Sequence, residues 1–155
     1  MKGNQEVIDT LNQLLTGELS AMDQYFVHGL MYEDWGLNEL HVRISHESDD
    51  ERVHAGKLVQ RILFLEGTPD VASREALNIG KNTQEMLQND LNYEYQVADN
   101  LRKAIALCEE KKDYQTREIL EVLLDETESD HMHWLEKQLG LISKVGLQNY
   151  LQSKM

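Results

Sequence analysis

Two copies of a Glu-x-x-His spacing stand out among the residues that could do chemistry. They are Glu51 with His54, and Glu128 with His131. On a helix, side chains three residues apart lie on one face, so each carboxylate and imidazole could bind the same metal ion. A single pair is weak evidence, because this spacing arises by chance and often forms a salt bridge on a solvated face. Its meaning depends on where the pairs lie relative to the apolar core.

Both pairs interrupt apolar stripes with the three- and four-residue spacing of a helix. Glu51 lies seven residues from two apolar positions of its stripe, and His54 follows on the same face. Glu128 and His131 fill the two positions of another stripe where apolar residues are expected. The apolar members of the two stripes are Ile44, Leu58, Ile62 and Leu65, and Leu124, Leu135, Leu139 and Ile142. Both pairs are therefore predicted to point into the core.

Two further glutamates, Glu18 and Glu94, interrupt the apolar stripes of two other helices in the same way. Those stripes are Ile8, Leu11, Leu15, Met22 and Phe26, and Leu87, Leu91, Ala98, Leu101, Ile105 and Cys108. An unpaired buried carboxylate costs several kcal/mol, so four of them require cations to neutralise them. The predicted metal ligands are Glu18, Glu51, His54, Glu94, Glu128 and His131. Oxygen and nitrogen donors without a thiolate suit two Fe or Mn ions better than structural zinc.

Composition agrees with a cation-binding protein and excludes several other classes. The 155 residues carry 28 Asp and Glu against 15 Lys and Arg, a formal charge of −13, which repels nucleic acid and attracts cations. Acidity alone is also common among proteins that only need solubility. The sequence has a single cysteine, Cys108, and shows neither an apolar signal segment nor an apolar run long enough to span a membrane. We therefore expect a cytoplasmic protein that contacts no membrane.

The elements that must position these ligands are helices. One proline, Pro69, and long stretches with helical periodicity predict an all-α fold, with helices at 4–34, 37–65, 82–110, 114–139 and 145–153. Turns are expected at Gly36 and Gly67, and Gly140 is expected to cap the fourth helix. The one long connection, 67–81, permits a crossover between two helical hairpins. We expect residues 1–155 to form a single four-helix bundle domain with a short fifth C-terminal helix.

Along nearly its whole length the sequence resembles a bacterioferritin, a member of the ferritin-like superfamily. The matching stretches are the opening MKG, GELSAMDQYF around Glu18, MYEDWGL, RILFLEG and the closing HWLEKQLGLISKVGLQNYLQ. The resemblance implies a hollow cage of two dozen subunits that stores ferric mineral, and an intrasubunit di-iron centre with ferroxidase activity. It also implies roles for the six ligands: Glu51 and Glu128 bridge the irons, Glu18 and Glu94 are terminal carboxylates, and each histidine binds one iron.

The register of the fourth helix decides which residues match the family. Relative to some members, this chain carries one extra residue between Arg117 and Glu128. Without that shift, Thr127 and Asp130 would occupy the ligand positions. We place Glu128 and His131 there because the following segment, Trp134-Leu135-Glu136, then aligns as well and the apolar stripe selects the same residues.

The resemblance departs from the family at the haem site. Members that bind haem b between two subunits use a Met directly after the bridging glutamate of the second helix, and here that residue is Arg52. A guanidinium cannot replace a thioether ligand, so we expect no normally ligated haem in a homomeric cage. Related cages contain two subunit types, one with the oxidation site and one with the haem Met. This chain resembles the first type.

Three accessory residues follow from the resemblance. Tyr25 matches a tyrosine near the di-iron site that could donate an electron, although a buried tyrosine that hydrogen-bonds a carboxylate would look the same. His46 and Asp50, four residues apart on one face, match an inner-surface iron site, although solvated surface residues would look the same.

The expected function is iron storage and detoxification, with Fe(II) oxidised by O2 or H2O2 and a ferredoxin-like partner for iron release. Three alternatives remain open. A smaller DNA-protecting ferritin relative would build its iron site between subunits. A non-catalytic or haem-dependent structural subunit of a mixed cage would not need the six ligands. An acidic helical interaction module without metal would have to acquire them by accident.

Overall fold

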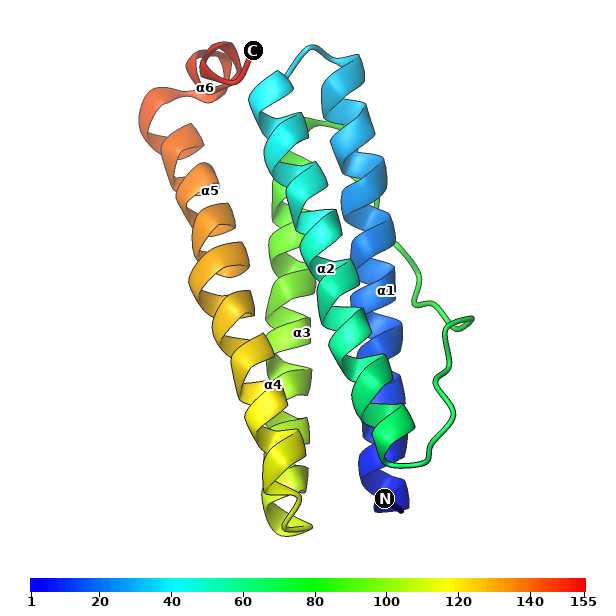
Figure 1. Ribbon diagram of the computed structural model, residues 1–155. Coiled ribbons are helices and arrows are strands. Elements are labelled where there is room, and N and C mark those ends of the chain that lie inside the picture. Colours follow the sequence, from blue (N-terminus) through cyan, green and yellow to red (C-terminus); the bar gives the residue numbers. More distant parts are fainter.

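The computed structural model describes residues 1–155 and contains helices but no strand, which confirms the all-α prediction. The elements are α1 (Gln5–Asp34), α2 (Asn38–Phe64), α3 (Thr83–Glu110), α4 (Tyr114–Glu126), η1 (Thr127–Met132), α5 (His133–Val145) and α6 (Leu147–Ser153). Four rods, formed by α1, α2, α3 and the continuous run α4–η1–α5, lie side by side, and α6 crosses one end of the bundle (Figure 1). None of the helices has the length and apolar character needed to cross a membrane.

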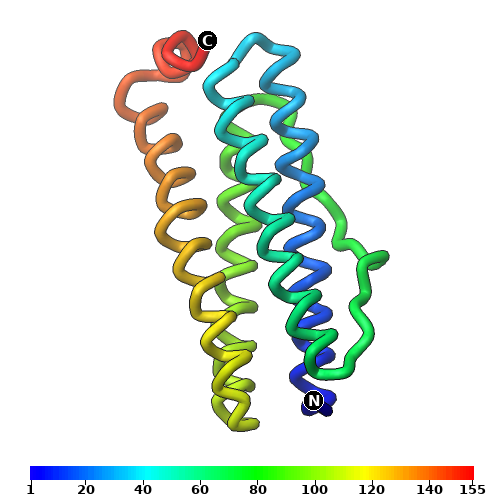
Figure 2. The backbone as a smooth tube through the Cα atoms, viewed as in Figure 1, coloured from blue at the N-terminus to red at the C-terminus, as the bar shows by residue number.

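The connections between the rods produce two antiparallel hairpins. A tight turn joins α1 to α2, and its Gly36 has φ +76°, a left-handed conformation that favours glycine. The chain then returns along the outside of α1 as a long crossover before α3 begins (Figure 2). This arrangement confirms the predicted four-helix bundle with one long crossover and a short fifth helix.

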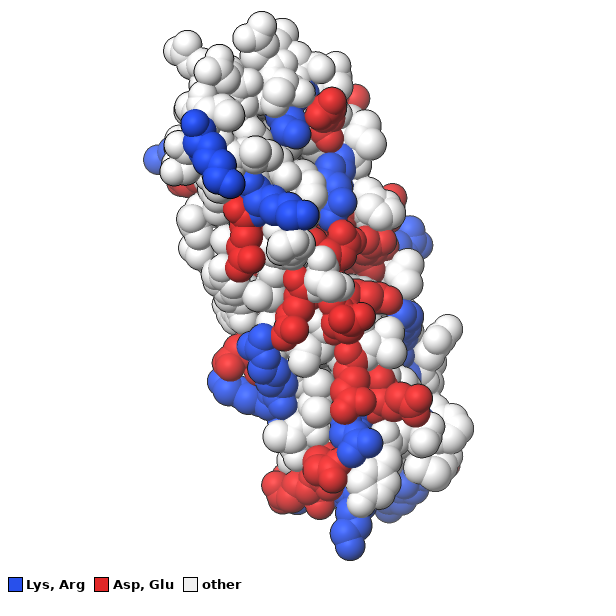
Figure 3. Space-filling view, turned by 90° about the vertical axis from the view of Figure 1, so that its left-hand side faces the viewer, with Lys and Arg blue, Asp and Glu red and all other residues white.

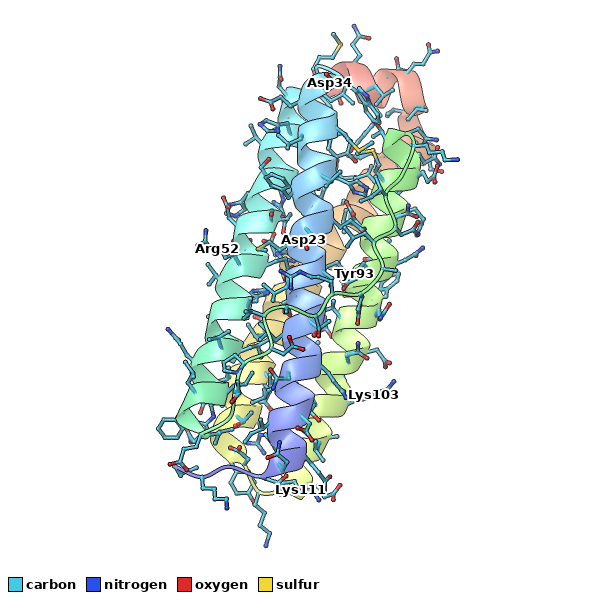
Figure 4. The ribbon with its side chains drawn as sticks, turned by 90° about the vertical axis from the view of Figure 1, so that its right-hand side faces the viewer. Asp23, Asp34, Arg52, Tyr93, Lys103 and Lys111 are labelled. Atoms are coloured by element: carbon cyan, nitrogen blue, oxygen red, sulfur yellow. The ribbon has the colours of Figure 1, made fainter.

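Side chains of α1 hold the crossover in place. Asn12, Ser20, Gln24 and His28 accept hydrogen bonds of 2.8 to 3.1 Å from backbone N–H groups of Asp70, Glu75, Asn78 and Gly80, respectively. On either side of the segment, Asp23 of α1 pairs with a crossover arginine and Tyr93 of α3 donates to a crossover carboxylate (Figure 4). The irregular segment therefore has many of its polar groups satisfied by the helices beneath it.

The fourth rod is longer than predicted. Elements α4, η1 and α5 follow one another without a break as far as Val145, so the prediction that Gly140 caps this helix is wrong. Ile142 is buried in the core beyond Gly140, and its packing outweighs the low helix propensity of one glycine. The break comes at Gly146, whose φ of +83° is left-handed.

The apolar core consists of two clusters. One contains Leu11, Leu58, Leu101 and Leu120, and the other contains Ile44, Leu87, Leu135 and Tyr150 of α6. On each rod the residues of these clusters lie on opposite sides of a buried polar layer. Phe26 does not belong to the core as predicted, because it is 61% exposed. The polar layer contains the candidate site.

Candidate metal centre

Five of the six predicted ligands lie together in the middle of the bundle. Glu18 comes from α1, Glu51 and His54 from α2, Glu94 from α3 and His131 from η1, and all five are buried. Their donor atoms form two groups, Glu18 with Glu51 and His54, and Glu51 with Glu94 and His131. Within each group all donor atoms lie within 4.8 Å of one another. Each group could hold one cation, and Glu51 belongs to both.

The two carboxylate oxygens of Glu51 face different histidines. Oε1 lies 2.9 Å from Nδ1 of His131, and Oε2 lies 3.4 Å from Nδ1 of His54. Glu94 Oε1 is 3.3 Å from the same His131 nitrogen, and Glu18 Oε2 is 3.8 Å from the His54 nitrogen. Glu51 therefore has the geometry of a carboxylate that bridges two metal ions, with Glu18 and Glu94 on opposite sides.

The pKa values of the cluster residues show that the negative charge of the cluster is not balanced without a cation. Burial, and then the neighbouring charge of Glu51, raise the pKa of Glu18 well above its ordinary value. Burial alone would lower the pKa of His54, but Glu18 and Glu51 raise it to about 11. The pKa of His131 is also raised, since Glu47, Glu51 and Glu94 outweigh its burial. Without metal, imidazolium charges replace part of the missing cationic charge.

Buried polar atoms without a hydrogen-bond partner support a metal site more directly. Both oxygens of Glu18, one oxygen each of Glu51 and Glu94, and Nδ1 of His54 are buried without a hydrogen-bond partner. Buried polar atoms normally have such partners, and several orphaned oxygens in one place are costly. Carboxylate and imidazole donors fit iron well.

Glu128 is not brought into this cluster, and the prediction that it points into the core is wrong. Its side chain is 43% exposed, and its Oε1 accepts a hydrogen bond of 2.5 Å from Arg102. The residue on the buried face is Thr127. The segment Thr127–Met132 is the π-helix η1, in which Thr127 and His131 lie about one turn apart and are both buried, whereas Glu128 is exposed.

Two carboxylates that the sequence analysis missed contact the histidines from outside. Glu47 Oε2 lies 2.6 Å from Nε2 of His131, and Glu126 Oε2 accepts a hydrogen bond of 2.6 Å from Nε2 of His54. The sequence carried a signal for Glu47, which lies one helical turn before Glu51 on the same face. No comparable signal marks Glu126, because it ends α4 and its contact with His54 of α2 depends on how the two helices pack.

The accessory residues lie close to the cluster. Tyr25 is buried, and its hydroxyl donates to Oε1 of Glu94. His46 and Asp50 lie 3.4 Å apart, with the His46 side chain 60% exposed, and Asp50 Oδ2 also lies 3.5 Å from Nε2 of His131. The pairing of His46 with Asp50 is thus present, and a metal ion at this position stays a prediction.

A pocket of about 320 Å³ leads from the surface to both histidines. Polar residues dominate its lining, which includes Asp50, His54, Lys57, Glu126, Asp130 and His131. Acidic side chains also gather across the middle of the face that carries the fourth rod (Figure 3). Negative charge around a polar opening favours the approach of cations.

Two residues of interest, His28 and Arg52, lie outside the cluster. His28 is fully buried, and its Nδ1 lies 2.9 Å from Oδ1 of Asp90. Arg52 is exposed and projects from α2 away from the bundle (Figure 4). Its guanidinium does not supply the thioether that haem ligation would need at this position.

Comparison with known proteins agrees with this geometry. Residues 8–145 match the model of the ferritin-like domain. Two similar relatives are named bacterial ferritin: that of Synechocystis is 57% identical over all of this chain and 99% of its own, and that of Pseudomonas aeruginosa is 53% identical over the full length of both. A bacterioferritin of Mycolicibacterium paratuberculosis is 41% identical over 97% of this chain and 94% of its own. The chain therefore belongs to the ferritin-like superfamily and, within it, to the bacterioferritins.

Proposed function

We propose that the chain is a ferroxidase subunit that oxidises Fe(II) to Fe(III) and delivers the product to a ferric mineral inside a hollow cage. The observation that carries this proposal is the position of Glu51, whose two oxygens face two different histidines. A bridging carboxylate holds two iron ions close together and tolerates a change in their charge. Iron storage and removal of reactive Fe(II) would follow from the same reaction.

In this proposal Fe(II) is the substrate and enters through the acidic pocket beside His54 and His131. Glu18, Glu51 and His54 hold one ion, and Glu51, Glu94 and His131 hold the other. Each Fe(II) gives up one electron. The two electrons and two protons convert O2 into H2O2, or H2O2 into two waters. Tyr25, which donates a hydrogen bond to Glu94, is placed to supply one electron in place of one Fe(II), with its phenolic proton passing to Glu94.

The surrounding assembly is part of the same proposal. Residues 1–155 form one ferritin-like domain, and two dozen copies build a cytoplasmic homo-oligomeric cage, or a mixed cage with a haem-binding subunit. Exposed apolar side chains on several elements, including Phe26, Leu63, Phe64 and Leu147, support burial between subunits. His46 and Asp50 form the inner-surface iron site, and a ferredoxin-like partner reduces the stored iron for release.

The proposal is tested by adding Fe(II) to purified, iron-free protein in air and following ferric absorbance in a stopped-flow instrument. We expect a fast phase that saturates near about two irons per chain, as a di-iron carboxylate centre requires. Glu51→Ala removes the bridging ligand and should abolish this phase. The same substitution at the exposed Glu128, Glu128→Ala, is the matched control and should retain it. Unchanged fast oxidation in Glu51→Ala, or no fast phase in the wild-type protein, would show that the cluster is not a ferroxidase site.

A further inference from the structure

Each histidine of the cluster has an inner and an outer nitrogen, and the outer one contacts a further carboxylate. For both rings Nδ1 faces the glutamates of the cluster, Glu51 among them, whereas Nε2 faces a carboxylate outside the cluster. Nε2 of His54 donates to Glu126, with 2.6 Å between nitrogen and oxygen. Nε2 of His131 lies 2.6 Å from Glu47 and 3.5 Å from Asp50. The two halves of the site therefore share one pattern, although their outer carboxylates come from different helices.

A basic side chain contacts each outer carboxylate. Arg43 Nε lies 2.5 Å from Oε1 of Glu47, and its Nη2 donates to Asp130 at 2.7 Å. The guanidinium of Arg43 also lies over the ring of Trp134, 4.8 Å from its centroid. On the other half, Lys57 Nζ lies 3.7 Å from Oε1 of Glu126. Oε1 of Glu47 thus lies against the positive charge of Arg43, and Oε2 lies against Nε2 of His131. Glu47 also belongs, with Asp50, Asp130 and His131, to a third group of potential metal ligands, but a metal ion there would compete with Arg43 for Glu47.

We propose that Glu47 and Glu126 are positioning residues that keep the proton of His131 and His54 on Nε2 and so leave Nδ1 of each ring free to bind metal. A carboxylate behind a metal-binding histidine selects the tautomer, orients the ring and makes the ligating nitrogen more basic. This inference rests on the proposed metal site. It adds two residues that affect metal binding through the histidines they contact.

The two positioning residues differ in burial, and their effects should differ accordingly. The Glu47 side chain is 2% exposed, whereas that of Glu126 is 44% exposed. Water screens an exposed carboxylate and can replace it as an acceptor for Nε2–H. Loss of a residue behind a metal ligand typically lowers metal affinity about 10- to 100-fold. We expect Glu47→Leu near the upper end of that range and Glu126→Leu near the lower end.

The test uses the full-length, purified protein loaded with Zn²⁺, which binds the same donors without redox chemistry. The chain contains six histidines, so ¹⁵N-histidine labelling gives a simple solid-state NMR spectrum, and His54→Gln and His131→Gln assign the two rings. In the wild-type protein Nδ1 of both rings should show a metal-bound shift, and Nε2 the shift of a protonated nitrogen. Chelator competition measures Zn²⁺ affinity in wild type and in Leu and Gln variants of Glu47, Glu126 and the exposed control Glu128.

The outcomes separate positioning from a structural role. Gln retains an acceptor for Nε2–H, so Glu47→Gln and Glu126→Gln should recover part of the affinity that the Leu variants lose. Both Glu128 variants should bind like wild type, and melting temperatures verify that every variant is folded. A metal-bound Nε2, or wild-type affinity in both Leu variants, overturns the inference even if two Zn²⁺ bind per chain. If the wild-type protein binds no pair of Zn²⁺ ions, the proposed metal site itself fails.

Discussion

His54 and His131 stack with nearly parallel rings in the centre of the bundle, with ring centroids 5.8 Å apart and an angle of 21° between their planes. The rings come from α2 and η1, elements that are far apart in the sequence. Two imidazolium rings would repel each other at this distance. The surrounding carboxylates offset that repulsion, as the raised pKa values of both rings indicate. The stack is therefore sensitive to anything that changes the charge of the cluster.

The first prediction concerns pH and the metal-free protein. The pKa of His54 is about 11 in the folded chain against an ordinary value of 6.5, so its protonated form stabilises the fold. This contribution is complete below pH 6.5 and is lost as the pH rises toward about 11. The free energy of unfolding, measured with denaturant in the presence of a chelator, should fall across that range.

The control for this pH dependence is His54→Gln, which removes the titrating ring and should flatten the curve. The raised pKa of His131 acts in the same direction, so some decline should remain in the variant. A wild-type free energy of unfolding that stays level or rises between pH 6.5 and 11 would contradict the assignment of charged histidines.

The second prediction concerns Glu18, whose burial and proximity to Glu51 raise its pKa. Glu18→Gln removes a carboxylate whose charge is unfavourable without metal. The metal-free protein should gain stability on the order of 1 kcal/mol. Zn²⁺ affinity should fall, because one charged ligand is lost. Denaturant unfolding and chelator competition measure the two effects. The exposed Glu118→Gln on α4 is a matched control that should change neither quantity, and a less stable metal-free Glu18→Gln would argue against electrostatic strain at this position.

The third prediction tests the register of the fourth rod. Because Glu128 faces solvent and pairs with Arg102, Glu128→Gln should leave the Zn²⁺ stoichiometry unchanged and alter stability by less than about 0.5 kcal/mol. Glu94→Gln, in contrast, should weaken binding strongly, because Glu94 lies within the buried cluster. Equal losses of Zn²⁺ binding in the two variants would restore Glu128 as a ligand.

The fourth prediction concerns haem. The homomeric wild-type protein should show no saturable Soret band when titrated with haem, because Arg52 is exposed and offers no thioether. Arg52→Met should create saturable binding with the spectrum of thioether-ligated haem, and Arg52→Leu is the apolar control without a ligand atom. Strong haem binding by the wild-type protein would show that another residue serves as the ligand.

Much of the fold followed from local patterns in the sequence. Helical periodicity and the scarcity of proline predicted the four rods, and the long segment 67–81 predicted the crossover. Four of the core ligands, Glu18, Glu51, His54 and Glu94, could be identified because each interrupts an apolar stripe on a regular helix. On such helices, spacing along the chain determines which face a side chain occupies.

Only the tertiary structure decided which residues of the fourth rod face the buried cluster. The π-helical turn η1 places His131 with the other ligands and turns Glu128 to solvent, and a periodicity argument that assumes a regular helix does not detect such a turn. The contacts of Glu126 with His54 and of Glu47 with His131 join residues from different helices. The sequence alone thus determined the helices and predicted a buried cluster of carboxylates and histidines that could bind metal. The packing of α2 against the fourth rod decided which carboxylates contact His54 and His131. These contacts depend on distances between elements, and spacing within one helix does not determine them.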